Sequence, residues 1–317
     1  MSSERDGGPT VSVIVPVYND PEGIDRTLSA LTDQTVADAE YEVLAVDNGS
    51  TDRTKDVIRE YRQRNPGLVT LGVEDDIQGS YAARNAGIER ATGEVIAFVD
   101  ADMTVDRRWL ASVREAMADA DYAGFDVQIE GTVEDGPVVA YNHVREFPVE
   151  RYLENGDFAP TCCLAVRRSV FELVGTFDAS LESSGDAEFG RRVADAGFDQ
   201  VFVPSVTMYH PPRSAAGLVR KYVRIGRGLH QRRRDHPERF DDEETGVGLA
   251  DVLPTVSPRQ LVASARDVQA RAGSTLSLRT LGVFYVLEQL VRLSTLVGRL
   301  AARLERDHPA GDRSTDE

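Results

Sequence analysis

Short apolar runs alternate with amphipathic stretches along the first hundred residues of the chain. The runs have the length and β-branched composition of buried strands, and the stretches between them have the spacing of helices. We predict strands at 11–17, 42–46, 68–73 and 95–99 and helices at 21–31, 51–64 and 80–91. Strands and helices in alternation form a parallel sheet covered on both faces. The sequence therefore predicts an α/β fold whose ligands bind beyond the carboxyl ends of the strands.

The alternation weakens after Trp109. Residues 122–166 mix short strands with loops, and a later strand is expected to stop at Pro204, as Pro16 is expected to end or edge the first strand. The second half yields a strand at 201–203 and helices at 167–174, 185–196, 214–235 and 276–305. The patterns predict a domain at 1–240, an acidic linker at 241–275, an amphipathic C-terminal helix at 276–305 and a flexible tail at 306–317.

The charge of the chain argues against one class of partner. Its 317 residues include 53 acidic and 36 basic ones, for a formal net charge of −17. A general nucleic-acid binder needs a basic face, so we expect no nucleic-acid partner. Lys55 and Lys221 are the only lysines. Abundant carboxylates with almost no lysine indicate a halophilic protein in high internal salt, which screens self-repulsion; a mildly acidic proteome from a GC-rich genome is the alternative.

The cysteines and the N-terminus bear on the compartment. Cys162 and Cys163 are adjacent and have no further cysteine to pair with, which excludes a disulfide framework and a four-cysteine zinc site. Residues 1–9 are polar and lack the apolar core of a secretory signal. We therefore expect a cytoplasmic protein, either free or at the inner face of the cell membrane.

Two carboxylates follow the most strand-like run of the chain. Asp100 and Asp102 are separated by one residue and come directly after the strand at 95–99. Hard oxygen ligands of this kind suit Mg²⁺ or Mn²⁺, with nucleotide phosphates completing the shell. A strand end followed by a turn, with an aspartate as helix cap, is the structural alternative.

Four segments together resemble family 2 glycosyltransferases over roughly residues 10–240. They are VSVIVPVYN at 11–19, VDNGSTDRT at 46–54, ARNAGIERATGEVIAFVDADM at 83–103 and VGTFDASLESSGDAEFGRRVADAGF at 174–198. The resemblance implies a GT-A fold, with a Rossmann-like, mostly parallel central sheet flanked by helices, here followed by a C-terminal helical extension. It also implies a nucleotide-sugar donor and a divalent metal, Mn²⁺ or Mg²⁺.

The resemblance assigns roles at the donor site. Pro16, Val17, Tyr18 and Asn19 would line the pocket of the nucleotide base. Asp47 would accept a hydrogen bond from the ring N–H of a uracil or thymine, unless it serves only as a helix cap.

Further roles follow for phosphate and metal. Arg84 would contact phosphate or sugar, although a surface arginine needs no such role. Asp100 would face the ribose and the metal, and Asp102 would be the direct metal ligand. His210 occupies the place of the late histidine that GT-A enzymes often supply to the metal or diphosphate; a surface histidine is the alternative.

The resemblance also implies a catalytic base. Asp186 aligns with the carboxylate that takes the acceptor's proton in an inverting transfer. Gly185 replaces the glutamate that usually precedes this residue, so Glu188 and Glu182 remain candidates. Asp186 as a helix N-cap is the structural alternative.

Two C-terminal features leave alternatives open. Positive charge gathers in one helix, where it would capture a diphosphate or an anionic acceptor, or form a solvated face paired with residues 241–244; its members are Arg220, Lys221, Arg224, Arg227, Arg232, Arg233 and Arg234. The final helix carries charges that argue against a bilayer span. It either packs on the catalytic domain or on a homodimer partner, or lies in a membrane interface.

These inferences combine into one expected function. The chain would be a metal-dependent inverting glycosyltransferase that moves a sugar from a nucleotide-sugar, with UDP favoured over GDP and dTDP. The acceptor would be a hydroxyl or a lipid phosphate in cell-surface glycan, glycolipid or glycoprotein assembly. A non-catalytic glycosyltransferase-like scaffold and a nucleotidyltransferase are the alternatives, although residues 11–23 lack the glycine-rich, lysine-containing phosphate loop that the latter normally shows.

Overall fold

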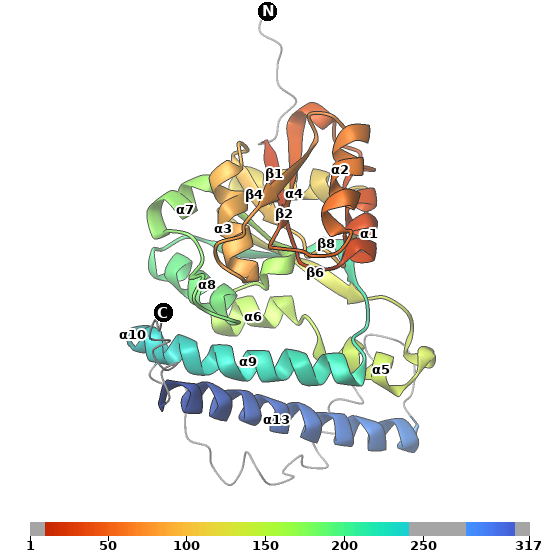
Figure 1. Ribbon diagram of the computed structural model, residues 1–317, viewed down its shortest axis with the longest axis vertical. Helices are drawn as coiled ribbons and strands as arrows, with labels where there is room; N and C mark the ends of the chain where they lie inside the picture. The colour runs from red at the N-terminus through yellow and green to blue at the C-terminus, as the bar shows by residue number, and fades with distance from the viewer. Residues whose placement is uncertain (1–9, 241–276, 308–317) are drawn as a thin grey trace, which may run out of the picture. The chain divides into compact units, whose positions relative to one another are not determined.

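A computed structural model describes residues 10–240 and 277–307 (Figure 1). The described chain forms two compact units. Unit 1 comprises 10–130, 145–180 and 185–211, and unit 2 comprises 131–144, 181–184, 212–240 and 277–307. The expectations for the N-terminal nine residues, for the linker and for residues 308–317 lie outside the described part. The compact units do not divide at the predicted boundary at 240, because helices before and after it pack together in unit 2.

Unit 1 is built on an eight-stranded sheet in the order β3-β2-β1-β4-β7-β6-β8-β5. The first four strands along the chain are parallel to one another, β7 runs antiparallel to β4 and β6, and β5 runs antiparallel to β8. This confirms the predicted, mostly parallel sheet. The strands are β1 (Val11–Val17), β2 (Tyr41–Asp47), β3 (Val69–Val73), β4 (Val95–Phe98), β5 (Thr104–Val105), β6 (Tyr122–Ile129), β7 (Leu164–Arg167) and β8 (Gln200–His210).

Helices cover the sheet of unit 1. The chain moves outward from β1 to β3 and then returns across the sheet to β4, so right-handed crossovers place α1 and α2 on one face and α3 on the other (Figure 1). The helices are α1 (Pro21–Leu31), α2 (Thr54–Arg64), α3 (Ser80–Arg90), α4 (Trp109–Asp119), α6 (Val149–Gly156), α7 (Arg168–Val174) and α8 (Gly185–Asp195), with 3₁₀ turns at Asp38–Glu40 and Thr161–Cys163.

Helix α4 lies where the sequence pattern seemed to fade. It buries Trp109, Leu110, Val113 and Met117, which recur at helical spacing. The loss of alternation after Trp109 therefore marks a change in sheet direction and not a loss of regular structure, because the strands that follow, β6 and β7, run antiparallel to each other.

Pro16 does not end β1, which continues to Val17. Ile14 accepts a hydrogen bond from Val99 on the β4 side, and Val17 accepts one from Asn48 on the β2 side. Backbone groups alternate sides along a strand, so Pro16 faces the β4 side. Pairing with β4 stops at Ile14, and the missing N–H of proline is therefore not needed there.

The predicted end of the strand 201–203 at Pro204 is wrong. Strand β8 continues to His210. Its parallel pairing with β6 shifts register between Phe125 and Asp126, and Pro204 lies among the unpaired residues of this irregularity. A bulge accommodates a proline that cannot donate to the ladder. His210 is consequently the last residue of a long strand and not part of a loop.

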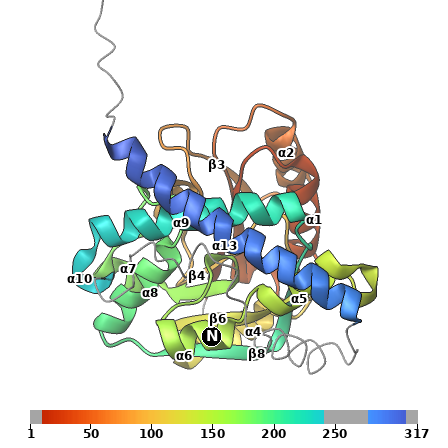
Figure 2. The ribbon, with the colours of Figure 1, turned by 90° about the horizontal axis from the view of Figure 1, so that it is seen from below.

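Unit 2 is helical. Helices α9 and α13 pack on each other: they run alongside in Figure 1, and α13 crosses α9 in Figure 2. Helix α5 packs against them. The shared apolar cluster contains Ala140, Tyr141, Leu218, Phe284, Leu287 and Val291. The helices are α5 (Pro137–Arg145, whose last residue belongs to unit 1), α9 (Ala215–Asp235), α10 (Pro237–Phe240) and α13 (Leu278–Asp307), with a 3₁₀ turn at Val133–Asp135.

Two glycines bring α9 and α13 into backbone contact. A Cβ atom at Gly226 would lie 2.0 Å from the carbonyl oxygen of Thr295, and one at Gly298 would lie 2.0 Å from that of Val223. No side chain fits in either place unless the helices separate. The close approach of this pair therefore depends on glycine at both positions.

We expect Gly298→Ala to lower the free energy of unfolding by about 1–3 kcal/mol, because the added methyl group overpacks the helix contact. Gly282→Ala is the matched control on the same helix, since a Cβ there meets nothing within 4 Å. The control should gain about 0.5–1 kcal/mol from helix propensity. Urea unfolding followed by circular dichroism measures both, and equal effects of the two substitutions would contradict the contact.

Candidate active site

The loop after β1 carries the residues predicted to line a base pocket. Residues 16 and 17 are buried within the strand, and Tyr18 is exposed just beyond it. Asn19 has a left-handed φ of 49°. Its backbone N–H donates to Ser50 Oγ at 2.9 Å, and its Oδ1 accepts from the N–H of Thr51 at 2.9 Å. Asn19 thus joins the loops after β1 and β2 and leaves the Tyr18 ring open for stacking on a planar ligand.

Asp47 ends β2 with a completely buried side chain. Its Oδ2 accepts from the backbone N–H of Ser50 at 3.0 Å and lies 3.6 Å from Lys55 Nζ. Within the described part of the chain, its buried Oδ1 has no hydrogen-bond partner. A buried acceptor left unpaired costs about 1–3 kcal/mol. Capping therefore accounts for Oδ2 of Asp47, whereas Oδ1 is a buried acceptor without a donor among the described residues.

Asn48 organises a third loop, and the sequence analysis did not single it out. Its Nδ2 donates to the carbonyl oxygens of Glu74 and Ile77, both at 2.8 Å. Its Oδ1 accepts from Gln78 Nε2 at 2.9 Å and from the N–H of Gly79 at 2.6 Å. All four bonds reach residues about 30 positions away, so the local sequence, which is typical of a turn, does not reveal the role.

Arg84 and Asp100 form a partly buried ion pair. Arg84 Nη2 lies 2.6 Å from Asp100 Oδ1, and the two side chains are 4% and 35% exposed. The Arg84 guanidinium also lies over the Tyr81 ring, 5.5 Å from its centroid. Arg84 is therefore not a surface arginine. It orients Asp100, whereas a direct contact with phosphate or sugar stays a prediction.

Helix α1 holds the turn that carries the two aspartates. Thr27 Oγ1 donates to the carbonyl oxygen of Met103 at 2.6 Å, and Arg26 Nη2 donates to that of Asp102 at 3.2 Å. A Cβ atom at Gly23 would lie 2.8 Å from the carbonyl oxygen of Ala101. The turn is thus packed closely on α1, which leaves the Asp102 carboxylate partly exposed.

Strand pairing brings His210 to Asp102. Strand β5 follows Asp102 almost directly, and Thr104 is opposite Tyr209 in the antiparallel pair with β8. As a result, His210 Nε2 lies 3.7 Å from Asp102 Oδ2, with the His210 side chain only 1% exposed. The alternative of a surface histidine is therefore wrong.

The imidazole of His210 is oriented through its other nitrogen. Nδ1 lies 2.6 Å from the carbonyl oxygen of Pro211, which can only accept, so Nδ1 carries a proton. In the neutral ring, Nε2 then presents a lone pair on the side of Asp102. A backbone carbonyl that fixes the tautomer in this way is a common support of metal-binding histidines.

Asp186 lies half-buried in the first turn of α8, and Tyr81 holds this turn. Tyr81 Oη accepts from the backbone N–H groups of Gly185 at 2.9 Å and Asp186 at 3.3 Å. A Cβ atom at position 185 would lie 2.8 Å from the Tyr81 ring. The tyrosine thus occupies the space that a side chain at 185 needs, which explains why glycine stands in the place of glutamate. Sequence reasoning missed Tyr81 because it lies about 100 positions away.

The two other candidate bases are engaged in ion pairs. Glu188 is buried, and both of its oxygens lie 2.8 Å from Arg192 nitrogens. Glu182 belongs to unit 2, where its carboxylate accepts from Arg227 Nε at 2.9 and 3.0 Å. Asp186 Oδ1 accepts from the backbone N–H of Ala187 at 3.0 Å, and its role as the base stays a prediction.

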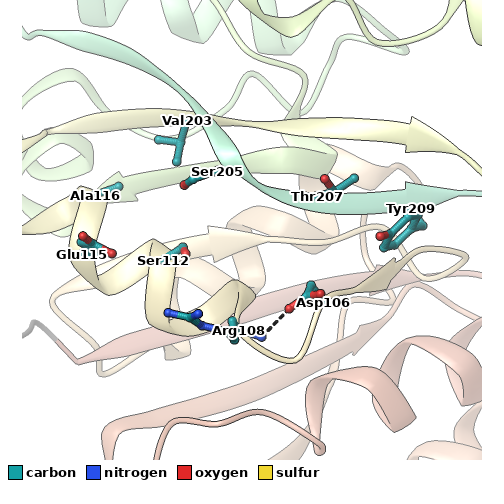
Figure 3. A pocket seen from close by; sticks show the side chains of 9 residues that line it. All are labelled: Asp106, Arg108, Ser112, Glu115, Ala116, Val203, Ser205, Thr207 and Tyr209. Atoms are coloured by element: carbon teal, nitrogen blue, oxygen red, sulfur yellow. Dashed lines mark hydrogen bonds between the residues drawn. The ribbon is translucent and has the colours of Figure 1, made fainter. Parts of the chain in front are cut away.

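A separate cavity of about 670 Å³ opens in unit 1 (Figure 3). Tyr209 lines it, and neighbouring residues of a strand point to opposite faces, so His210 is directed away from it. Its lining includes a turn in which the N–H of Arg108 donates to Asp106 Oδ1 at 2.8 Å. The lining residues are Asp106, Arg108, Ser112, Glu115, Ala116, Val203, Ser205, Thr207 and Tyr209, none of which the sequence analysis proposed as a site residue.

Comparison with known proteins decides the family. The family model for glycosyl transferase family 2 matches residues 12–175. The chain is also 38% identical over 228 residues to Glycosyltransferase AglE of Haloferax volcanii, which covers 70% of this chain and 74% of AglE. The chain belongs to glycosyl transferase family 2.

Other relatives of this family 2 glycosyltransferase match shorter segments. A poly(ribitol-phosphate) beta-glucosyltransferase of Bacillus spizizenii is 33% identical over 113 residues, 34% of this chain and 18% of that protein. Family membership confirms a glycosyltransferase that takes nucleotide-sugar donors, and it sets the nucleotidyltransferase alternative aside.

Solved structures confirm the GT-A fold. The mannosyltransferase PcManGT from Pyrobaculum calidifontis has a TM-score of 0.61 at 21% identity, over 94% of this chain and 88% of that one. S. aureus TarS 1-349 in complex with UDP-GlcNAc has a TM-score of 0.51 at 17% identity, over 93% and 92%. At these identities the likeness concerns the fold alone.

The contact between Tyr81 and Gly185 can be tested by stability alone. We expect Gly185→Ala to lower the free energy of unfolding by about 1–3 kcal/mol, because its methyl group meets the tyrosine ring. In a Tyr81→Ala background, the space is open and the same substitution should cost much less. A double-mutant cycle from urea unfolding should then give a coupling of about 1 kcal/mol or more, and strict additivity would show that the ring does not exclude the side chain.

Proposed function

We propose that this glycosyltransferase transfers a sugar from a UDP-sugar with inversion, in the assembly of a cell-surface glycan, glycolipid or glycoprotein. Asp186 is the base, and Asp102 with His210 binds Mn²⁺ or Mg²⁺. The observation that carries the proposal is the pairing of β5 with β8, which sets an oriented imidazole 3.7 Å from the carboxylate of Asp102 at the edge of the sheet.

The donor atoms at this edge fit a divalent cation that also binds phosphate. Across residues 10–240 and 277–307, no three His, Cys, Asp or Glu side chains form a group that could hold a metal ion. The protein would therefore supply Asp102 and His210, and the diphosphate would complete the shell, as is usual for Mg²⁺ at substrate phosphates.

The donor site suits a nucleotide with an imide ring. The unpaired Oδ1 of Asp47 needs an N–H donor, and uracil, thymine and guanine each present one. Tyr18 offers a face for stacking beside it. Among proteins of this fold, TarS is solved with UDP-GlcNAc and PcManGT with GDP-Man and Mn²⁺. We favour uridine, with guanosine as the alternative that the experiment must separate.

The chain's own residues then account for the transfer. Arg84 holds Asp100 in a fixed orientation at the edge where the ribose and diphosphate bind. Asp186 removes the proton of the acceptor hydroxyl as the oxygen attacks the anomeric carbon and the bond to the diphosphate breaks, which inverts the configuration. A bound divalent cation supplies charge neutralisation for the departing diphosphate. A lipid-phosphate acceptor is already ionised, so Asp186 would matter much less for it.

A thermal-shift screen tests the donor site. UDP, GDP, dTDP and their sugars are compared with and without Mn²⁺ in high salt. Binding at 100 times Kd stabilises the native state by about 2.7 kcal/mol, which raises Tm by roughly 4 °C for a protein of this size. We expect the shift to require UDP and metal and to vanish in Asp102→Ala.

Asp119→Ala is the matched control for this screen. Asp119 is an exposed carboxylate at the end of α4, and its removal should leave the shift intact. A metal-dependent shift with GDP alone would replace uridine by guanosine, and no shift with any nucleotide in folded protein would favour the non-catalytic scaffold.

The base is tested separately from the donor site. We expect Asp186→Asn to keep the full thermal shift with nucleotide and to lower kcat toward a hydroxyl acceptor by about 10²–10⁴-fold. NMR of the product should show an inverted anomeric centre. Retention of configuration, or an Asp186→Asn variant with normal turnover on a hydroxyl acceptor, would contradict the assignment.

A further inference from the structure

One face of α13 is apolar and exposed. Five large apolar side chains are 40–66% exposed, and their separations of seven, four, three and four residues place them on one line along the helix. We call this line the apolar stripe; it consists of Val286, Leu293, Val297, Leu300 and Leu304. The opposite face is buried through Phe284, Leu287 and Val291 in the apolar cluster of unit 2. The stripe is therefore not the face that holds α13 in place.

Helices α9 and α13 are both basic in an acidic protein. Seven of the 21 residues of α9 and five of the 30 residues of α13 are Lys or Arg, against one and three acidic residues. The chain as a whole carries −17. On α13, Arg279 and Arg303 are exposed near its two ends. Other arginines of the two helices are paired with carboxylates, among them Arg227, Arg234 and Arg292. Arg279 and Arg303 are thus exposed cations on the helix that carries the stripe.

Acidic side chains of α13 are engaged within unit 2. Glu288 accepts from Tyr141 Oη at 2.9 Å, and Glu305 pairs with Arg227 Nη2 at 2.6 Å. These contacts reduce the repulsion that an anionic partner would meet. An apolar stripe with arginines around it fits a surface that is apolar beneath and negative at its boundary, as an anionic lipid layer is.

A second copy of the chain fits this surface less well. A two-fold contact places the same patch on both partners, so α13 would face α13 and its arginines would approach one another. An anionic lipid surface neutralises those charges instead.

A spanning orientation also fits poorly. Arg279–Glu305 is long and apolar enough to cross a membrane by length and composition. However, one side of α13 is packed on α9 and α5, and Tyr141 is bonded to it. This packing favours a helix lying flat in the interface.

We propose that unit 2 docks on an anionic lipid surface, with the apolar stripe of α13 inserted at the headgroup boundary and its arginines on lipid phosphates. The proposal goes beyond the sugar transfer and does not depend on it. No nucleotide or metal enters its test, so failure of lipid docking is distinguishable from failure of the proposed function.

Vesicle flotation of the full chain tests the stripe. We expect the protein to float with phosphatidylglycerol vesicles and Leu293→Gln/Leu300→Gln to lose at least about tenfold in affinity, because half-exposed leucines no longer enter the lipid. Leu173→Gln is the matched control, an equally conservative change at a 69% exposed leucine of α7 in unit 1, and should float like the native protein. Circular dichroism and Tm verify that all variants are folded.

The arginines are tested in the same assay. We expect native protein to bind phosphatidylcholine vesicles less well than phosphatidylglycerol, and Arg279→Gln/Arg303→Gln to lose about fivefold per arginine at low salt. Equal binding to both lipids would overturn the electrostatic part, and no flotation of folded native protein would overturn the whole. A native dimer that becomes monomeric in the Leu293→Gln/Leu300→Gln variant, without vesicle binding, would assign the stripe to a second copy.

Discussion

The fold of unit 1 depends on the parallel pairing of β1 with a strand on each side. Strand β1 is buried along its whole length, between β2 and β4. Because the strands run the same way, the loops after them must meet at one edge of the sheet. This constraint brings the Asn19 loop to Asp47 and places both beside the turn that follows β4. The partly buried ion pair of Arg84 with Asp100 then fixes that turn from α3, on the face of the sheet opposite α1.

The second half of the site has a different physical origin. His210 reaches Asp102 through an antiparallel pair of only two positions, between β5 and β8. That pair exists because β8 bulges past Pro204 and continues to the same edge. The short strand β5 therefore brings the carboxylate of Asp102 next to the imidazole of His210. Tyr81 positions Asp186 in a similar way, because its hydroxyl oxygen accepts hydrogen bonds from the first two backbone N–H groups of α8.

In unit 2, one face of α13 is packed in the apolar cluster and the opposite face is exposed. Helices α9 and α13 approach so closely at Gly226 and Gly298 that their backbones are in contact at these two positions. Together with the apolar cluster, this contact buries one face of α13 and leaves the other to solvent. The exposed face is apolar, and α9 and α13, with 51 of the 317 residues, carry 12 of the 36 basic residues. This arrangement distinguishes unit 2 from the sheet unit that carries the chemistry.

The first four strands, the three helices between them and the family can all be predicted from the sequence, because buried strands and amphipathic helices have local periodicities and the motifs are contiguous. The sequence also predicts roles for Asp100, Asp102 and Asp186, which stay predictions. The course of β8 and the roles of Asn48 and Tyr81 follow from tertiary contacts. Their partners lie about 30 to 100 positions away, and no local pattern encodes a hydrogen bond over that separation. Glycine at 185 likewise cannot be explained from the local sequence, because the Tyr81 ring of another helix fills the space beside it.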